Sequence, residues 1–388
     1  MTKEKSTVPR LRFPGFTDAW KQRKLGEVAE KISQKNLDRQ YVETFTNSAE
    51  FGIISQRDFF EKNISSLDNI SGYYIVSPDD FVYNPRISNL APVGPIKRNK
   101  LGRVGVMSPL YTIFRFSDIH LDFVEKYFDT TIWHRYMELN GDSGARSDRF
   151  AIKDSVFKGL PIPLPTLPEQ EAIGSFFSDL DQLITLHQRK LDDVKELKKA
   201  LLQKMFPKGN GNDFPELRFP EFKDAWKQRK LGEVVDVCSG RDYKHLEAGS
   251  VPVYGTGGYM LSVSEALSEN VDAIGIGRKG TIDNPYILKA PFWTVDTLFY
   301  CLPKQGSILE FSYTIFQNIN WRSMDESTGV PSLSKVRINN IKVLTPSLQE
   351  QEAIGSFFSD LDQLITLHQR QLDHLKLLKK ALLQQMFI

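Results

Sequence analysis

The sequence predicts an α+β protein in which two globular α+β modules are joined by two long antiparallel coiled-coil helices. Two observations lead to this fold class. A short block and a long block of sequence each occur twice, in the same order, and the long block has the apolar spacing of a coiled-coil helix. The regions between the blocks differ in sequence, yet each has strand-like runs followed by a helical run. We therefore expect a pseudo-twofold arrangement within one chain.

The repeats set the expected domain boundaries. Leu11–Val28 matches Leu217–Val234 at 16 of 18 positions, and Glu169–Phe206 matches Glu350–Phe387 at 33 of 38 positions. Two repeats are too few for a solenoid, which needs three or more. We expect a first globular domain, a long helix, a Pro- and Gly-rich linker, a second globular domain and a second long helix at 1–168, 169–206, 207–216, 217–349 and 350–388.

The regions between the blocks, 29–168 and 235–349, are called the first module and the second module below. In the first module, strands are predicted at Tyr73–Val76, Phe81–Asn84, Arg103–Met107 and Tyr111–Phe116, with a helical run at His120–Leu139. In the second module, they are predicted at Val251–Tyr254, Ala273–Gly277 and Phe292–Leu302, with a helical run near Ser307–Trp321. The shared order predicts two versions of one α+β module with different surfaces.

The long block is predicted to be a helix of roughly 55 Å, because its apolar residues recur at alternating spacings of about four and three. The expected seam positions are Ile173, Phe177, Leu180, Ile184, His187, Leu191, Val194, Leu197, Leu201 and Met205, and Ile354, Phe358, Leu361, Ile365, His368, Leu372, Leu375, Leu378, Leu382 and Met386. Thr166-x-x-Glu169 and Ser347-x-x-Glu350 predict capping boxes. We interpret the two seam histidines as part-buried, hydrogen-bonded residues that help to set the register, because no further metal ligands are apparent beside them.

The composition is that of an ordinary soluble protein, with 40% hydrophobic and 25% charged residues. Two cysteines cannot form a disulfide framework, and no apolar run is long enough for a membrane span, so a cytoplasmic protein is expected. The net charge of +2 means that a DNA-binding surface would have to be a local patch.

Motifs for catalysis are weak. Gly275-x-Gly277-x-x-Gly280 matches a dinucleotide motif, but turn-like residues follow where a helix is needed, so we interpret it as a turn that carries Arg278 and Lys279. Asp283-Asn-Pro-Tyr286 and Tyr83-Asn-Pro-Arg86 only partly match the N-P-P-Y motif of adenine methyltransferases and are also interpreted as turns. No carboxylate set for a nuclease and no zinc ligands are evident, so we predict no catalytic residues and no metal.

Charge is more informative. The stretch Asn84–Ser117 holds six cations and no carboxylate, a composition that suits phosphate contacts, although a solvated loop face is the alternative. Glycine-rich turns in both modules could bring the backbone close to DNA. The candidate DNA-binding residues are Asn84, Arg86, Lys97, Arg98, Lys100, Arg103 and Arg146 in the first module, and Tyr254, Thr256, Gly257, Arg278 and Lys279 in the second.

The order of these features resembles the specificity (S) subunit of type I restriction–modification enzymes. The resemblance rests on RFPGF…W…LGEV, a variable module and the LPxPxxxEQxAI helix, all repeated once, and it covers essentially the whole chain. It implies that the modules are target recognition domains, each reading one half of an asymmetric bipartite DNA sequence. It also implies that the helices set the spacing and carry two modification (methyltransferase) subunits, to which restriction subunits join.

The resemblance implies no catalytic activity and no cofactor on this chain. S-adenosylmethionine would bind to the modification subunits, and ATP and Mg²⁺ to the restriction subunits. Identical outward residues in the two helices would dock identical partners, for which the candidates are Asp179, Gln182, Asp360 and Gln363. The rival hypotheses are a helical adaptor that binds no DNA and an enzyme that uses the glycine or N-P-Y motifs.

Overall fold

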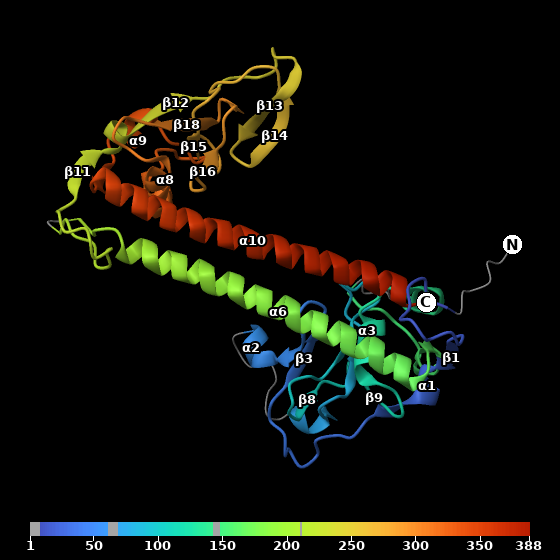
Figure 1. Cartoon of the computed structure of the whole chain (residues 1–388). Coiled ribbons are helices and arrows are strands. Elements are labelled where there is room, and N and C mark those ends of the chain that lie inside the picture. Colours follow the sequence, from blue (N-terminus) through green and yellow to red (C-terminus); the bar gives the residue numbers. More distant parts are fainter. Residues whose placement is uncertain (1–7, 61–68, 143–147, 210–211) are drawn as a thin grey trace. The chain divides into compact units, whose positions relative to one another are not determined.

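A computed structural model describes residues 8–60, 69–142, 148–209 and 212–388. The chain divides into two compact units, Met1–Leu186 with Leu372–Ile388, and His187–Gln371. The long helices α6 (Leu167–Lys204) and α10 (Leu348–Met386) each contribute residues to both units (Figure 1). Each unit is described by itself.

The first unit is built around an antiparallel four-stranded sheet with the strand order β2-β9-β6-β7. Its strands are β2 (Ala29–Ile32), β9 (Thr112–Phe116), β6 (Phe81–Tyr83) and β7 (Ile96–Arg98). Smaller two-stranded sheets are β1 (Lys21–Lys24) with β10 (Pro161–Leu164), β3 (Phe45–Ser48) with β4 (Gly52–Ser55), and β5 (Tyr74–Val76) with β8 (Gly105–Met107). The short helices are α1 (Leu25–Val28), α2 (Gln56–Phe60), α3 (Leu121–Phe128), α4 (His134–Asn140), α5 (Asp154–Phe157) and the 3₁₀ turn η1 (Ile70–Gly72).

The second unit repeats this plan. Its four-stranded sheet has the order β12-β18-β15-β16, formed by Val235–Ser239, Leu298–Pro303, Ala273–Gly277 and Tyr286–Leu288. A three-stranded sheet joins β14 (Gly258–Val263), β13 (Ala248–Gly255) and β17 (Trp293–Thr294), and β11 (Lys227–Lys230) pairs with β19 (Lys342–Thr345). The short helices are α7 (Leu231–Val234), α8 (Leu309–Asn318), α9 (Lys335–Asn339) and the 3₁₀ turn η2 (Trp321–Met324). The predicted α+β class, with one module plan used twice, is confirmed.

Several expected elements differ in extent. The helical run predicted at His120–Leu139 is two helices, α3 and α4, and the strand predicted at Phe292–Leu302 is divided into β17 and β18. In both places polar residues of an intervening turn interrupt the pattern. The paired strands β1–β10 and β11–β19 were not predicted, because Lys-Gln-Arg-Lys has no apolar alternation.

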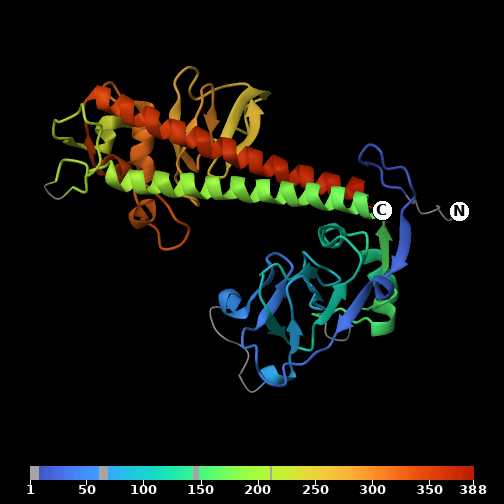
Figure 2. The same ribbon diagram turned by 60° about the horizontal axis from the view of Figure 1, so that its bottom comes forward.

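Within each unit, α6 and α10 run antiparallel, as Figures 1 and 2 show. In the first unit, Asp181 lies opposite Lys379 (2.6 Å between Oδ1 and Nζ), while in the second, Lys198 lies opposite Asp362 (2.5 Å between Nζ and Oδ1). Because 181 and 362 are equivalent positions of the repeat, as are 198 and 379, the same ion pair forms twice. The predicted antiparallel pairing is confirmed.

The predicted seam is wrong at two positions. Leu197 is 51% exposed and Leu378 is 40% exposed, whereas Lys198, which follows Leu197, is only 8% exposed, and Lys379, which follows Leu378, is half-buried. A straight helix has 3.6 residues per turn, so a strict seven-residue pattern drifts around its surface over several turns. The lysine stem replaces leucine at the interface, and its ammonium group meets a carboxylate of the facing helix.

The capping boxes are also only partly right. Ser347 Oγ accepts a hydrogen bond from Glu350 N (3.4 Å), as expected for one half of a box. Glu350 and its copy Glu169 do not cap, however, because their buried carboxylates bind the short block. Glu169 accepts hydrogen bonds from Arg12 Nε (2.6 Å) and Nη2 (2.7 Å) and from Trp20 Nε1 (3.3 Å). Glu350 repeats these contacts with Arg218 and Trp226.

Aromatic residues join the end of each long helix to the short block and the module. In the first unit, the Phe387 ring lies 6.1 Å from that of Trp20 and 5.3 Å from that of Phe123 on α3. The second unit repeats the cluster with Phe206, Trp226 and Phe311. The start of one long helix and the end of the other therefore share a core with each module.

A glycine in each long helix lets the module helix approach closely. A Cβ atom at Gly355 would lie 2.8 Å from the backbone nitrogen of Phe311, and one at Gly174 would lie 2.9 Å from that of Phe123. Gly355→Ala is therefore expected to destabilise the fold by about 1–3 kcal/mol, although alanine favours a helix interior by about 1 kcal/mol. Chemical denaturation monitored by circular dichroism measures this loss. Ser356→Ala, at the exposed neighbouring position, is the control, and a Gly355→Ala chain more stable than wild type would contradict the close approach.

Candidate nucleic-acid interface

In the second module, the turn after β15 exposes two cations. Gly277 ends the strand, and a Cβ there would lie 1.9 Å from the Thr281 carbonyl oxygen, while Gly280 has φ +87°. No helix follows within the described residues before β16, so the dinucleotide hypothesis fails and the predicted turn is confirmed. Arg278 and Lys279 are both exposed on this turn.

Backbone contacts fix the turn against two other segments. Arg278 N donates to Thr297 O (2.8 Å). In the loop before α9, Leu333 N donates to Arg278 O (3.0 Å). Arg241 is held against the same 294–297 segment, because its backbone nitrogen donates to Thr294 O (2.9 Å). Three exposed cations, Arg241, Arg278 and Lys279, are thus supported by one segment, and in the part of the chain that the structure describes none of them pairs with a carboxylate.

The β13–β14 hairpin carries the other candidates of this module. Thr256 and Gly257 form its tip, and Gly257 is exposed. The Tyr254 ring lies 6.1 Å from that of Tyr286, whose hydroxyl donates to Gly255 O (2.6 Å). Burial raises the pKa of Tyr286, which keeps this hydroxyl a donor. Val295 N donates to Tyr254 O (3.0 Å), so the 294–297 segment that holds the Arg278 turn also contacts the strand leading to the hairpin tip.

The first module has an equivalent turn after β6. Arg86 is 65% exposed, and its backbone forms an isolated antiparallel β-bridge with that of Arg149, in the loop that precedes α5. Asn84, by contrast, is buried: its Nδ2 donates to Asn47 O (2.8 Å) and its Oδ1 accepts from Arg86 N (3.0 Å). Arg146 lies outside the described residues. Arg149 and Arg241 were not singled out from the sequence, because only tertiary pairing brings them to these turns.

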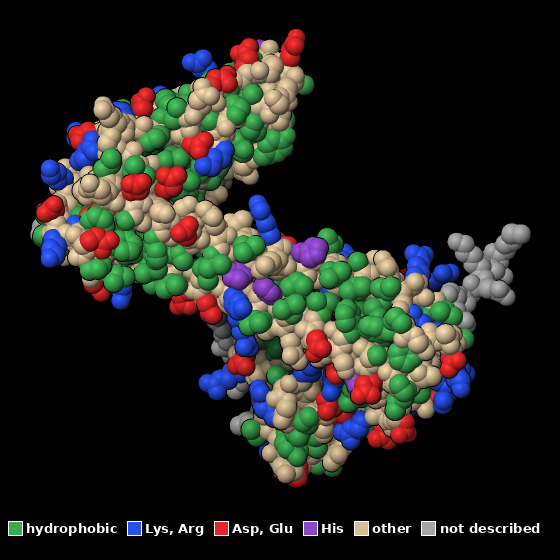
Figure 3. All heavy atoms as spheres, in the orientation of Figure 1, with side chains coloured by type: hydrophobic (Ala, Val, Ile, Leu, Met, Phe, Trp, Pro, Cys, Tyr) green, Lys and Arg blue, Asp and Glu red, His purple; other side chains and the backbone are tan. Residues whose placement is uncertain are grey.

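The cations of Asn84–Ser117 are not the uncompensated patch that their local sequence suggests. Each meets a carboxylate from elsewhere in the first module. The pairs are Arg86–Asp148, Lys97–Asp129, Arg98 with Asp79, Asp122 and Glu125, Lys100–Glu125, Arg103–Glu43 and Arg115–Asp80. In the space-filling view, basic and acidic side chains are likewise interleaved (Figure 3).

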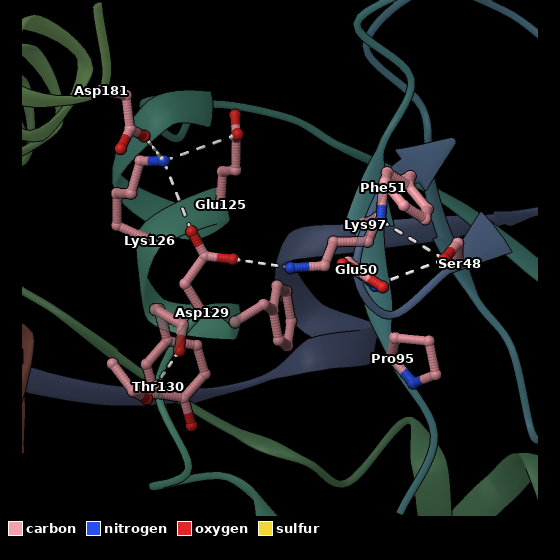
Figure 4. A network of polar contacts seen from close by, with 12 residues as sticks. Ser48, Glu50, Phe51, Pro95, Lys97, Glu125, Lys126, Asp129, Thr130 and Asp181 are labelled. Atoms are coloured by element: carbon pink, nitrogen blue, oxygen red, sulfur yellow. Dashed lines mark hydrogen bonds and ion pairs between the residues drawn. The ribbon is translucent and has the colours of Figure 1, made fainter. Parts of the chain in front are cut away.

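A buried ionic network fixes the first module to α6 (Figure 4). Lys126 on α3 is 3% exposed, and its Nζ lies 2.5 Å from Asp181 Oδ2 and 3.4 Å from Asp129 Oδ2. Lys97 Nζ binds the other oxygen of Asp129 at 2.8 Å. Burial would raise the pKa of Asp129, but Lys97, Lys126 and Lys379 outweigh it and hold that pKa below its ordinary value. Lys97 is thereby engaged in anchoring the module.

The predicted docking residues lie on an exposed helix face that occurs in both units. Asp179 and Gln182 are exposed on α6, beside Leu183 (40% exposed) and Leu186 (47%). On α10 the same letters are exposed again, as Asp360, Gln363, Leu364 (38%) and Leu367 (50%). We call these surfaces the α6 face and the α10 face. Exposed leucines that packing within the units does not use are typical of a surface for a partner.

The family model described as the type I restriction modification DNA specificity domain matches residues 17–196 and 223–377. These ranges cover most of the chain and include both modules. The chain belongs to this family. The resemblance noted in its sequence is confirmed.

Known members of the specificity family agree with this assignment. The type I restriction enzyme MjaVIII specificity subunit of Methanocaldococcus jannaschii is 24% identical over an alignment of 276 residues, and the match covers 60% of this chain and 62% of that protein. The match thus spans about three-fifths of the curated relative's length. The crystal structure of a type I restriction–modification S subunit from M. genitalium has a TM-score of 0.68 at 18% identity, covering 98% of this chain and 99% of that one.

A second solved structure, from work on complex assembly and conformational transition of the type I system, has a TM-score of 0.53 at 12% identity and covers 95% and 97% of the two chains. Both structures show that this specificity-family chain shares their fold. Among its described residues, no three histidine, cysteine or acidic side chains gather as metal ligands. None of the described helices is both long and apolar enough to cross a membrane.

Proposed function

We propose that this chain is the DNA-reading specificity subunit of a type I restriction–modification complex, in which each module reads one half of an asymmetric bipartite target. The observation that carries this proposal is the equivalent turn after β6 and β15. In the first module this turn forms a β-bridge with the loop before α5, at Arg86–Arg149, and in the second it forms one with the loop before α9, at Lys279–Ser332. In both modules the turn exposes cations. One scaffold with different residues at the same turn suits the reading of two different half-sites.

The chain acts as a non-catalytic member of its complex. Methyl transfer to adenine would belong to two modification subunits, which bind S-adenosylmethionine, and restriction subunits would bring ATP and Mg²⁺. We further propose that α6 and α10 set the spacing of the half-sites, because each is one unbroken helix, of 38 and 39 residues. A soluble cytoplasmic location fits these partners.

The Arg278→Ala/Lys279→Ala double variant tests DNA reading by the second module. In the complex with modification subunits, we expect weaker duplex binding and a salt dependence reduced by about two units of log–log slope, roughly one for each lost phosphate contact. Titrations of duplex DNA from low to moderate salt measure both quantities. Lys223→Ala, which removes an exposed cation of the short block, is the control and should change neither.

Unchanged affinity and slope in the double variant would exclude this turn from the interface. If the chain were instead an adaptor that binds no DNA, the wild-type complex itself would show no salt-dependent affinity for duplex DNA. Mapping methylated adenines in cells with and without the chain separates these two outcomes, because only a specificity subunit determines which sites are modified.

The α6 face and the α10 face are proposed to dock one modification subunit each, together with Asp179, Gln182, Asp360 and Gln363 beside the leucines. A charge placed within a desolvated interface opposes binding. Leu183→Asp/Leu186→Asp is therefore expected to leave one modification subunit bound instead of two, as native mass spectrometry would show. Adding Leu364→Asp/Leu367→Asp should remove the second.

Leu377→Asp is the matched control for docking. Leu377 is 68% exposed on α10, but the repeat has Glu196 at the equivalent position, so this leucine is not part of a duplicated surface. Two bound subunits in the fourfold leucine variant would refute docking at these faces and would leave recent duplication as the reason for their identity.

A further inference from the structure

His187 on α6 and His368 on α10 face each other within the second unit. Their ring centroids are 5.9 Å apart and the rings are inclined by 55°. They are equivalent positions of the repeat, because they are separated by 181 residues, which is the offset between the two copies of the long block. In an antiparallel pair of near-identical helices, equivalent residues meet only at the pseudo-twofold axis, so this pair marks that axis.

The two imidazoles share an unmet polar requirement. The Nδ1 atoms of His187 and His368 are both buried, and neither has a hydrogen-bond partner among the described residues. The sequence-based expectation of hydrogen-bonded seam histidines is thus not met at Nδ1. The nearest seam positions on the C-terminal side, Leu191 and Leu372, are each 1% exposed and offer no polar group. A buried nitrogen lone pair without a partner is costly, and here the cost arises twice at one place.

We infer that His187 and His368 together bind one divalent transition-metal cation, of the Zn²⁺ or Ni²⁺ class, on the pseudo-twofold axis. Imidazole nitrogen is a preferred ligand of these cations. With metal–nitrogen bonds of about 2.0–2.1 Å and a nitrogen roughly 1.1 Å from its ring centroid, two bound rings have centroids about 5.2 Å apart at a tetrahedral angle and about 6.4 Å apart when collinear. The observed 5.9 Å lies within this range.

Two protein ligands leave the remaining coordination positions to water. Such a site differs from a closed structural zinc site, which has four protein ligands and often supplies the folding energy outright. Here the helices pair without metal through leucines and the Lys198–Asp362 ion pair. Bound metal would add a reversible cross-link between α6 and α10 and would raise the stability of the folded chain as metal concentration rises. His187 and His368 are each half-buried, so part of each ring remains open to water.

The full-length chain, freed of metal with a chelator, is titrated with NiCl₂ and with ZnCl₂ in a calorimeter, and its thermal unfolding is followed at each concentration. We expect one site per chain and a melting temperature that rises with metal. His187→Gln and His368→Gln are each expected to weaken binding at least tenfold and to remove the thermal shift. His374→Gln, which changes an exposed histidine of the same helix, should bind like wild type.

Absence of metal binding by the wild-type chain at millimolar concentration overturns the proposal. So does binding that only one of the two glutamine variants weakens, since both imidazoles are required. Should a glutamine variant fail to fold, His368→Cys retains a metal ligand of small volume. Its Co²⁺ complex should then show a thiolate charge-transfer band, and a Co²⁺-loaded variant without that band also counts against the site.

Discussion

Replacing Glu350 by alanine is expected to cost the second unit about 3–5 kcal/mol, the range for breaking a buried ion pair from one side. The Glu350 side chain is 1% exposed and is held in a bidentate pair by Arg218, which is 13% exposed. It also accepts the indole N–H of Trp226 at 3.2 Å. Its removal leaves the Arg218 guanidinium with the Asp224 carbonyl oxygen as its remaining acceptor, and it leaves the indole N–H without the acceptor that it has in the wild type. Water hardly reaches this place, so the lost contacts are not replaced.

The measurement is urea denaturation followed by tryptophan fluorescence, with Glu352→Ala as control, because Glu352 is exposed two residues further along α10. That control should stay within about 0.5 kcal/mol of wild type. The matching variant Glu169→Ala should weaken the first unit through Arg12 and Trp20 in the same way. An Arg218→Ala/Glu350→Ala cycle with no coupling energy would show that the pair does not support the fold.

This pair shows what the sequence could and could not predict. The identity of the repeats, which extends to polar positions, already contained the signal: both copies have the Arg, the Trp and the Glu. Acidic residues near a helix N-terminus are most often exposed caps, so Glu169 and Glu350 were assigned to capping boxes. Only the folded chain brings the short block against the helix start, about 150 residues away in the first half.

The candidate DNA interface was predictable to a similar extent. The glycine-rich turn with Arg278 and Lys279 follows from local residue types, because Gly277 and Gly280 are required by the backbone itself. The charge of Asn84–Ser117 was not predictable from composition, because the neutralising carboxylates come from other segments, such as Glu43 and Asp129. Counting the charges within one stretch of sequence predicts the charge of the folded surface only when no oppositely charged residues from other segments pack against it.

Replacing Lys126 by methionine is expected to cost the first unit about 3–5 kcal/mol of stability at neutral pH. The sequence did not predict this role either, because its partner Asp181 comes from another segment. A lysine on an amphipathic helix is normally solvated, but this one is 3% exposed and faces Asp129, Asp181 and Glu125. Burial would lower the pKa of Lys126, yet these carboxylates raise it, so the residue stays charged. Methionine keeps the volume but leaves Asp129 and Asp181 to Lys97 and Lys379. Glu125 retains Arg98 and Lys100.

The pH dependence of this loss identifies its cause. Because the folded pKa of Asp129 is held below its unfolded value of about 3.9, its ionisation stabilises the fold above that pH, and this contribution is lost as the pH falls through the lowered folded pKa. In Lys126→Met the burial of Asp129 is less well opposed, so its folded pKa rises and acid no longer removes as much stability. The difference between wild type and Lys126→Met should therefore be largest near pH 7 and shrink below about pH 4.

Lys100→Met is the control for the network, since Lys100 is 56% exposed and its pair with Glu125 should contribute no more than about 1 kcal/mol. Denaturation curves of the three chains from neutral to acid pH provide the comparison. If lost packing alone were responsible, the cost of Lys126→Met would not change with pH. A cost that grows toward acid pH would mean that Asp129 is not stabilised by its lysines, and the network of Figure 4 would then be a contact without an energetic role.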